Sequence, residues 1–371
     1  MDNNVETVRK LFSKGYINCK EDEIIFRKPK NYDLPKFDKI EGMLLGLAIG
    51  DSLGNTSESG SVGRRNKRYG IIKSYLPNKH LGMKRKGFPS DDTQLAFDTV
   101  EVFLKNDYLN VKELADVFCS HHIYGIGKTV MAFIKNYKDK KIPWYKAGVK
   151  MSSNGALMRI APVVVPHINH PMGLYSDAVL DTMLTHNDSL AIASSVAYVD
   201  MLWDFIHKQS GEIDKEEQLK KFSKIVSSIT GGETCTTRRE VDDGLFNNDI
   251  YSGDAGIFIE KCVNLGLKEK WKTIEFHRKI GSGAFLMETV PTALFIILNN
   301  IDEPRQAIIE SVNYTRDNDT IAAIVGAAVG ALHGKKFLDN DWIENLSGCV
   351  KGNDEGAVQR MIKEVSNRLE N

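Results

Sequence analysis

Helical periodicity dominates the pattern of apolar and polar positions along this chain. In NYTRDNDTIAAIVGAAVGALHG, residues 313–334, apolar side chains recur at the spacing of one helix face: Ile321, Ile324, Val325, Ala328, Val329 and Leu332. Gly334 is a suitable C-terminal stop for that helix. A second such face follows Asp92, at Leu95, Ala96, Val100, Phe103 and Leu104. The stretch EGMLLGLAIGDSLG, residues 41–54, is apolar nearly all round, which predicts a buried central helix.

The alternating pattern that predicts a β-sheet is scarce, so the expected fold class is all-α, a compact single-domain helical bundle. Gly326 and Gly330 would let a neighbouring helix approach closely. Residues 207–250 begin as a charged amphipathic segment and become loop-like, which predicts a surface excursion within the fold.

Residues 1–39 are predicted to be an N-terminal extension of a domain formed by residues 40–371. The extension carries one apolar pattern at Val5, Val8, Leu11 and Phe12 and a second at Ile24, Ile25 and Phe26. Pro29 and Pro35 then interrupt helix and favour an extended path. We do not expect the helical core to need this extension, and its apolar faces suit docking on a partner.

Charge is balanced, with 49 Lys and Arg against 49 Asp and Glu, so no global field would draw the protein to nucleic acid or an anionic membrane. The five cysteines are scattered and contain no C-x-x-C pair, which indicates reduced packing residues. The N-terminus lacks the apolar core of a signal peptide, and no run approaches the ~20 apolar residues of a membrane span. The expected location is the cytoplasm.

Two acidic clusters stand at the starts of predicted helices. PSDDTQLAF places Asp91 and Asp92 after the hydroxyl of Ser90, and RDNDTIAAI places Asp317 and Asp319 before Thr320. Helix capping explains either cluster alone, because an aspartate accepts hydrogen bonds from the first backbone N–H groups of a helix. Capping needs only one acid per helix, however, and a third acidic stretch, GDSLGNTSE, adds to the set. Together the clusters predict a site for Mg²⁺ or Mn²⁺, with acids kept ionised by the helix N-termini.

Three other families with similar strings fit less well. The D-x-D-x-T of haloacid-dehalogenase phosphatases follows an apolar strand, and SVNYTR is a poor strand. Prenyl synthases need a third acid where Leu95 stands. A phosphate-binding loop of the G-x-x-x-x-G-K-T type would need glycine at His122.

The ordered set of motifs resembles the ADP-ribosylglycohydrolase family, all-helical enzymes that include dinitrogenase-reductase-activating glycohydrolase and ADP-ribosyl-acceptor hydrolases. The similarity runs from about Ile40 to Gly334. It rests on GMLLGLAIGDSLGNTSE, SDDTQLAF, SSNGALMRIAP, THNDSLAIASS, GSGAFLMETVPTAL and RDNDTIAAIVGAAVGALHG, in the family's order. Thr315 and Ser153 depart from the family's usual residues at their positions.

The resemblance implies that two Mg²⁺ or Mn²⁺ ions are held by Ser90, Asp91, Asp92, Asp317, Asp319 and Thr320. Asp317 and Asp319 would flank Asn318 in an extended turn, with Thr320 starting the helix, so that the two acids point the same way. Glu58 would be a further ligand or an acid–base carboxylate. The candidate catalytic carboxylates are Glu58, Asp92 and Asp317.

The remaining motifs would hold ADP-ribose. Glycines let the backbone approach phosphates closely, and they occur in YGIGKT and SSNGALMR. The candidate substrate-binding residues are Gly125, Gly127, Asn154, Gly155, His186, Ser282 and Gly283. Taken singly, these residues are also explained by ordinary turns, caps and packing.

The implied function is metal-dependent hydrolysis that removes ADP-ribose from a modified protein side chain, with arginine as the first choice of acceptor. The partner would be an ADP-ribosylated protein. The alternative is a binding protein: an immunity factor that blocks an ADP-ribosylating toxin through residues 1–39, with or without hydrolysis.

Overall fold

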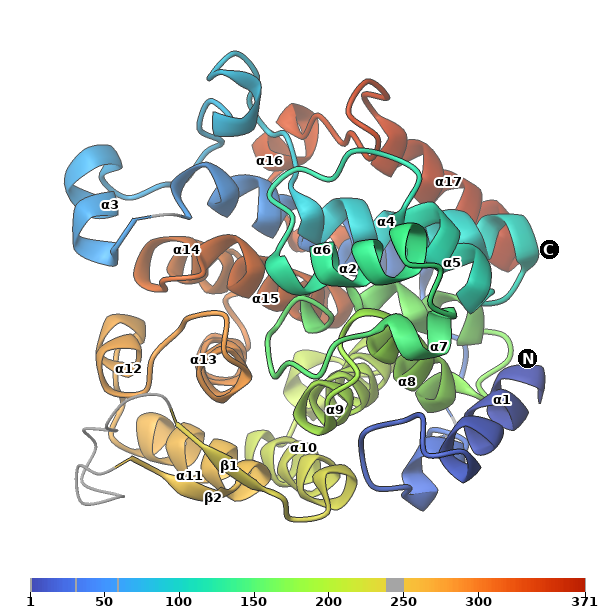
Figure 1. Ribbon diagram of the computed structural model, residues 1–371. Helices are drawn as coiled ribbons and strands as arrows, with labels where there is room; N and C mark the ends of the chain where they lie inside the picture. Colours follow the sequence, from blue (N-terminus) through green and yellow to red (C-terminus); the bar gives the residue numbers. More distant parts are fainter. Residues whose placement is uncertain (1, 31, 59, 238–249, 371) are drawn as a thin grey trace.

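The computed structural model describes residues 2–30, 32–58, 60–237 and 250–370 of the 371-residue chain (Figure 1). Helices make up nearly all of its regular structure. The first half contains α1 (Asp2–Ser13), α2 (Phe37–Gly54), α3 (Val62–Tyr69), α4 (Asp91–Asn106), α5 (Val111–Phe118), α6 (Lys128–Ile134), α7 (Trp144–Ala147) and α8 (Leu174–Thr185). The second half contains α9 (Ser189–His207), α10 (Lys215–Thr230), α11 (Ala255–Lys268), α12 (Thr273–Lys279), α13 (Leu286–Asn299), α14 (Pro304–Tyr314), α15 (Asn318–His333), α16 (Asn340–Asn345) and α17 (Ala357–Glu370).

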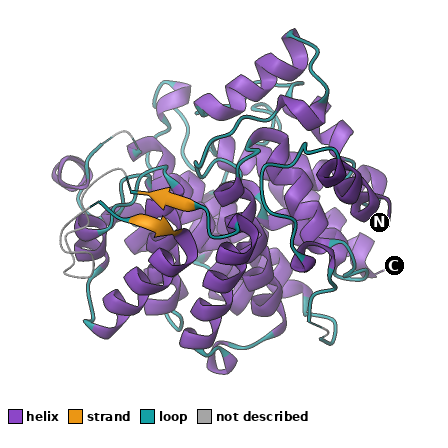
Figure 2. Ribbon diagram, turned by 60° about the horizontal axis from the view of Figure 1, so that its bottom comes forward, coloured by secondary structure: helices purple, strands orange, loops and turns teal. Residues whose placement is uncertain are grey.

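The strands of the described chain are short. β1 (Thr234–Thr236) pairs antiparallel with β2 (Ser252–Asp254), and Figure 2 shows this pair lying in front of the helices. Thr234 lies opposite Asp254 in the register. The all-α prediction is therefore confirmed.

Helices α2 and α15 pack backbone to backbone through a stripe of small residues. A methyl group added at Gly46 would lie 2.1 Å from the carbonyl oxygen of Gly326, and one at Gly42 would lie 2.5 Å from that of Gly330. At the end of α2, a methyl group at Gly54 would lie 2.4 Å from the Cα atom of Asp319. The close approach predicted from Gly326 and Gly330 is thus realised, and it brings the end of α2 against the start of α15.

The apolar faces of the N-terminal segment are buried within the chain. Helix α1 and the short 3₁₀ helix η1 (Glu23–Phe26) lie along α8, so that Val8 and Ile25 have no exposed surface. Leu11 and Ile24 are buried as well, and Phe12 and Phe26 pack against the core. Contrary to our expectation, Val8, Leu11, Ile24 and Ile25 belong to the helical core, whereas Val5, Phe12 and Phe26 stay partly exposed.

The predicted surface excursion divides into an ordered helix and a segment outside the described residues. Helix α10 packs its apolar face, including Phe222 and Val226, into the core, while residues 238–249 are not described.

Helix α9 is long and apolar enough to cross a membrane by composition, a feature that the sequence analysis missed, but the protein buries it as a central helix. All five cysteines are free thiols.

Candidate active site

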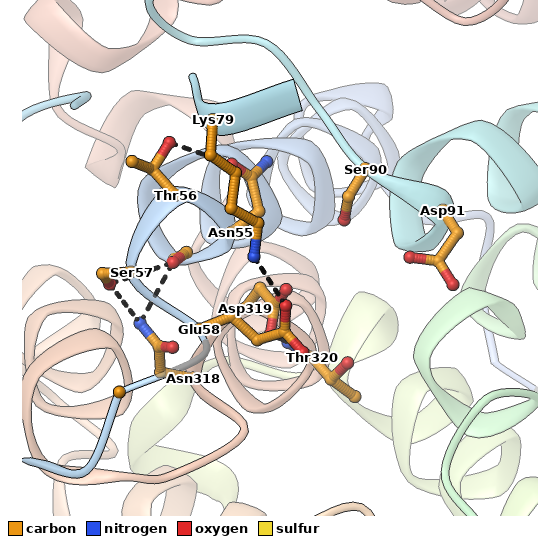
Figure 3. Close-up of polar contacts among 12 residues, drawn as sticks. Asn55, Thr56, Ser57, Glu58, Lys79, Ser90, Asp91, Asn318, Asp319 and Thr320 are labelled. Carbon is orange, nitrogen blue, oxygen red and sulfur yellow. Dashed lines mark hydrogen bonds and ion pairs between the residues drawn. The ribbon is translucent and has the colours of Figure 1, made fainter. Parts of the chain in front are cut away.

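The starts of α4 and α15 face one cavity of about 340 Å³. This volume is in the range of small-molecule sites. Glu58, after α2, and Asp319 and Thr320, at the start of α15, line one side of the cavity. Ser90 and Asp91 lie across from them at the start of α4 (Figure 3). Two clusters more than 200 residues apart in the sequence therefore meet, as the metal prediction requires.

Glu58, Asp317 and Asp319 form the tightest acidic group among the described residues. One carboxylate oxygen from each lies within 4.8 Å of the other two. Glu58 follows the 3₁₀ helix η2 (Asn55–Ser57), which comes directly after α2. Its half-exposed side chain accepts a 2.8 Å bond from Lys79 Nζ (Figure 3). The cavity thus has a partly exposed acid at its mouth and buried acids at its base.

The N-cap residues of α4 and α15 make no side-chain capping bond, although Asp319 Oδ1 accepts a 3.0 Å bond from Thr320 N–H in the first turn of α15. Helix α4 begins at Asp91, and its N-cap residue Ser90 makes no side-chain capping bond. Helix α15 begins at Asn318, and its N-cap residue Asp317 makes none either. The expected extended turn before Thr320 is therefore wrong, since the helix already starts two residues earlier. Capping does not explain why four acids stand here.

Burial and mutual repulsion raise the pKa values of the cavity acids. Burial is the main cause at Asp91, whose pKa rises to about 7, and at Asp317, whose pKa rises to about 6. The pKa values of Asp92 and Asp319 are raised well above the ordinary value, by burial first and then by neighbouring carboxylates. In the protein without cations, desolvation and neighbouring charges thus oppose the ionisation that the helix N-termini were expected to favour.

Asn318 and Arg65 hold the loop that carries two of the acids. The Asn318 amide donates to Gly54 O, Ser57 Oγ and Val312 O at 3.0–3.2 Å. Its side-chain oxygen accepts a 3.0 Å bond from Arg65 Nη2. The buried Arg65 guanidinium also donates to the carbonyl oxygens of Ser57, Gly60, Val312, Thr315 and Arg316. Asn318 therefore faces the end of α2, while its two acidic neighbours line the cavity.

Asp51 holds the start of α4, as Asn318 and Arg65 hold the start of α15. This fully buried carboxylate accepts a 2.8 Å bond from Ser90 N–H and a 2.6 Å bond from Ser90 Oγ. It also accepts bonds from the N–H and the hydroxyl of Thr93. Asp51 thus fixes both sides of the Asp91–Asp92 pair.

The donor set fits divalent cations of the magnesium type. Asp92 Oδ1 is buried without a hydrogen-bond partner among the described residues. An orphaned carboxylate oxygen beside three other acids is costly unless positive charge compensates it. Hydroxyls at Ser90 and Thr320 complete a set of hard oxygen donors on the cavity wall.

Comparison with known proteins identifies the family. A model of the family described as ADP-ribosylglycohydrolase matches residues 33–370. The chain belongs to the ADP-ribosylglycohydrolase family. It is 22% identical over 323 residues to the ADP-ribosyl-[dinitrogen reductase] glycohydrolase of Rhodospirillum rubrum, covering 85% of this chain and 92% of that protein. The ADP-ribosylarginine hydrolase Tri1 of Pseudomonas putida is 21% identical, covering 89% and 78%.

A solved structure titled "ADP-ribosylglycohydrolase-related protein complex" shares the fold. It matches with a TM-score of 0.59 and 20% sequence identity, covering 89% of this chain and 96% of that chain. This structure shows the fold alone, and membership of the family gives the chain an activity class, the hydrolytic removal of ADP-ribose.

Most of the residues predicted to bind ADP-ribose line the cavity of this family member: Gly125, Gly127, Asn154, Gly155 and His186. Two of these residues bond to the cavity acids. Gly127 N–H donates to Asp91 Oδ2 at 3.2 Å, and Asn154 donates to Asp317 Oδ2 at 2.7 Å. Gly155 leaves room for the His186 ring, since a methyl group there would lie 3.0 Å from its Cε1 atom. Burial, followed by the charge of Arg159, lowers the pKa of His186 to about 3, so the ring is neutral.

Ser282 and Gly283 are not among the cavity-lining residues. Ser282 Oγ accepts a 2.8 Å bond from Arg316 N–H, and its carbonyl oxygen accepts a 2.9 Å bond from Asp317 N–H. Gly283 N–H donates to Glu288 Oε2. Ser282 therefore supports the backbone that enters α15, whereas Gly283 bonds to a side chain of α13.

The sequence analysis missed Asp51 and Arg65 as functional residues of this ADP-ribosylglycohydrolase. Asp51 lies in the quoted GDSLG motif, and an acid inside an apolar helix is a signal that could have been used. Arg65 lies in a run of basic residues, VGRRNKRY, and nothing in that pattern distinguishes it from its exposed neighbours.

Proposed function

We propose that this protein is a divalent-metal-dependent hydrolase that releases ADP-ribose from arginine side chains of modified proteins. The observation that carries the proposal is the meeting of two acid pairs, from α4 and α15, at one cavity beside His186 and the loop around Gly155. The reaction releases a side chain that is bonded to a sugar, and its transition state carries positive charge on the sugar ring. Carboxylates around the cavity suit such a transition state.

The residues that would hold two Mg²⁺ or Mn²⁺ ions are Ser90, Asp91, Asp92, Asp317, Asp319 and Thr320, with Glu58 as a further donor. Such ions, when bound, would compensate the negative charge of the carboxylates, attract ribose hydroxyls and favour ionisation of water. Asn154 and Gly127, through their bonds to Asp317 and Asp91, would keep those acids turned toward the cavity.

The reaction breaks the bond between the anomeric carbon of ribose and the acceptor nitrogen. Water supplies the hydroxyl group that the anomeric carbon gains and the proton that the leaving arginine gains. Positive charge that develops at the anomeric carbon would be stabilised by the neighbouring carboxylates. The proton of the attacking water would pass to Glu58, Asp92 or Asp317.

The choice of arginine rests on the relatives named as ADP-ribosylarginine hydrolases, at 21% and 22% identity. The test uses peptides ADP-ribosylated on arginine or on serine, with Mg²⁺ or with EDTA. We expect release from the arginine peptide in Mg²⁺ and none in EDTA. Release from the serine peptide alone would overturn arginine as the acceptor. No release from either peptide would overturn the assignment of hydrolase activity.

A matched pair of variants separates catalysis from capping. Asp91→Ala should lower turnover by orders of magnitude with little loss of stability. Asp214→Ala removes an exposed N-cap that accepts two backbone bonds at the start of α10, and it should cost ~1 kcal/mol of stability without loss of turnover. The acids would be structural if Asp91→Ala kept full turnover.

The alternative function, a toxin-blocking arm in residues 1–39, lacks a supporting observation. The apolar side chains on which it rested, including Val8 and Ile25, are buried against the chain's own core. Immunity to a toxin stays a prediction that nothing in the fold favours.

A further inference from the structure

The N-terminal segment, residues 2–30, precedes the region that matches the family and is bonded to the helices behind the cavity. Ser176 Oγ on α8 donates to Ile25 O, and Lys20 N–H donates to Ile229 O at the end of α10. In Figure 1 the segment lies beside α8, apart from α4 and α15. Its contacts are therefore with the side of the molecule that carries His186.

One contact joins this segment to the loop of His186 itself. Asn18 N–H donates to the side-chain oxygen of Asn187 at 2.9 Å, and the Asn18 amide donates to Asn187 O at 3.0 Å. The Asn187 amide donates to Tyr16 O at 2.7 Å. Asn187 is 7% exposed, so these bonds are largely shielded from water. Three bonds thus fix the residue that follows His186.

The loop held in this way forms part of the cavity wall. His186 Nε2 lies 3.0 Å from Ser153 Oγ, and its Nδ1 lies 2.8 Å from Thr185 Oγ1. On the other side of Asn187, Asp188 accepts a 2.9 Å bond from Ser152 Oγ and caps α9. Movement at Asn187 would therefore shift both His186 and the serines opposite it.

We propose that Asn18 and Asn187 are positioning residues, through which the N-terminal segment fixes the His186 wall of the cavity and sets the affinity for the ADP-ribose group. This inference rests on the proposed function. The segment acts through hydrogen bonds to the loop and not by touching substrate. The metal-binding acids stand on α4 and α15, so loosening the loop weakens substrate binding and leaves metal binding intact.

The experiment measures ADP-ribose affinity, KM, kcat and Mg²⁺ affinity in the full-length chain. Asn187→Ala removes two of the three bonds, and KM and the ADP-ribose Kd should rise about five- to tenfold with kcat within about twofold. Asn18→Ala removes one bond at an exposed residue, so the rise should be about two- to threefold. Mg²⁺ affinity should not change in either variant.

Asn4→Ala is the matched control. The Asn4 amide also makes two bonds from the N-terminal segment, to Leu109 O and Asp177 Oδ1 at 2.8 Å, and neither partner lines the cavity. This variant should lose thermal stability with an unchanged KM. The positioning role is overturned if Asn187→Ala shows the same unchanged KM while the wild type binds ADP-ribose. A wild type that neither binds ADP-ribose nor hydrolyses either peptide overturns the proposed function instead.

Discussion

The guanidinium group of Arg65 donates a 3.0 Å hydrogen bond to the side-chain oxygen of Asn318, the residue that separates Asp317 from Asp319. Because no carboxylate is among the hydrogen-bond acceptors of Arg65 in the described structure, its positive charge faces the cavity acids without being neutralised by any one of them. Burial lowers its pKa to about 10, so it stays charged at neutral pH. Arg65 both shapes the acidic loop and offsets part of its charge.

Arg65→Lys should therefore weaken Mg²⁺ binding and lower kcat/KM by about tenfold or more, because lysine keeps the charge but loses the planar fork of donors. Unfolding free energy should fall by about 3 kcal/mol, since several carbonyl groups lose a charged donor. Arg64→Lys, at the exposed neighbour on α3, is the control and should change neither quantity. Equal Mg²⁺ affinity in the two variants would contradict the role of Arg65.

Metal binding should release protons. The raised pKa values of Asp91 and Asp317, about 7 and about 6, mean that both hold protons near pH 6 without cations. Calorimetric titration with Mg²⁺ at pH 6 should show roughly one or more protons released, from the dependence of the heat on buffer ionisation, and fewer at pH 8.5. Asp91→Asn should reduce the number released at pH 6. A heat that is independent of buffer at pH 6 would count against the protonated cluster.

The same shift predicts a pH-dependent stability in EDTA. The folded pKa of Asp91 lies above its ordinary value of 3.8, so its contribution is complete below about pH 4 and lost as the pH rises through 7. Urea unfolding of the wild type in EDTA should therefore show a steeper loss of stability over this range than Asp91→Asn. Saturating Mg²⁺ should remove the difference in slope, and identical slopes in EDTA would contradict the prediction.

Gly46→Ala should destabilise the protein by about 2 kcal/mol, because the added methyl group would lie 2.1 Å from the Gly326 carbonyl oxygen and the two helices must separate. Mg²⁺ affinity should also fall, since the α2–α15 contact aligns Glu58 with Asp319. Gly63→Ala on α3 is the control, because a methyl group there meets no atom within 4 Å. Urea unfolding should show Gly63→Ala as stable as the wild type or slightly more so. Equal stabilities of the two variants would rule out the close helix contact.

His186 should make the protein sensitive to acid. Its folded pKa of about 3 lies below the ordinary 6.5, so the stability it contributes is complete above pH 6.5 and lost as the pH falls toward 3. The loss should approach ~1.4 kcal/mol per pH unit in this window. His186→Gln should flatten the profile relative to the wild type, whereas His170→Gln, at an exposed histidine, should not. Parallel wild-type and His186→Gln profiles between pH 4 and 6.5 would show that His186 is not held neutral.

The sequence by itself determined the helical class, the central helices and the acids that face the cavity. The apolar periodicity around Ile324 and Leu95 is local, because a helix repeats every 3.6 residues whatever packs against it. The Asp91–Asp92 and Asp317–Asp319 clusters could be paired because each stands at a helix start, and their family motifs are short and contiguous.

Only the tertiary structure decided how those acids are held, in which direction their pKa values shift and where the N-terminal segment packs. Arg65 and Asp51 act across long sequence separations, so no local pattern marks them. The pKa values depend on desolvation and on neighbouring charges, which exist only after α2, α4 and α15 have met. Val8 and Ile25 show the same limit of sequence-based prediction. An amphipathic pattern predicts that an apolar face will be buried, but only packing decides whether the chain itself or a partner buries it.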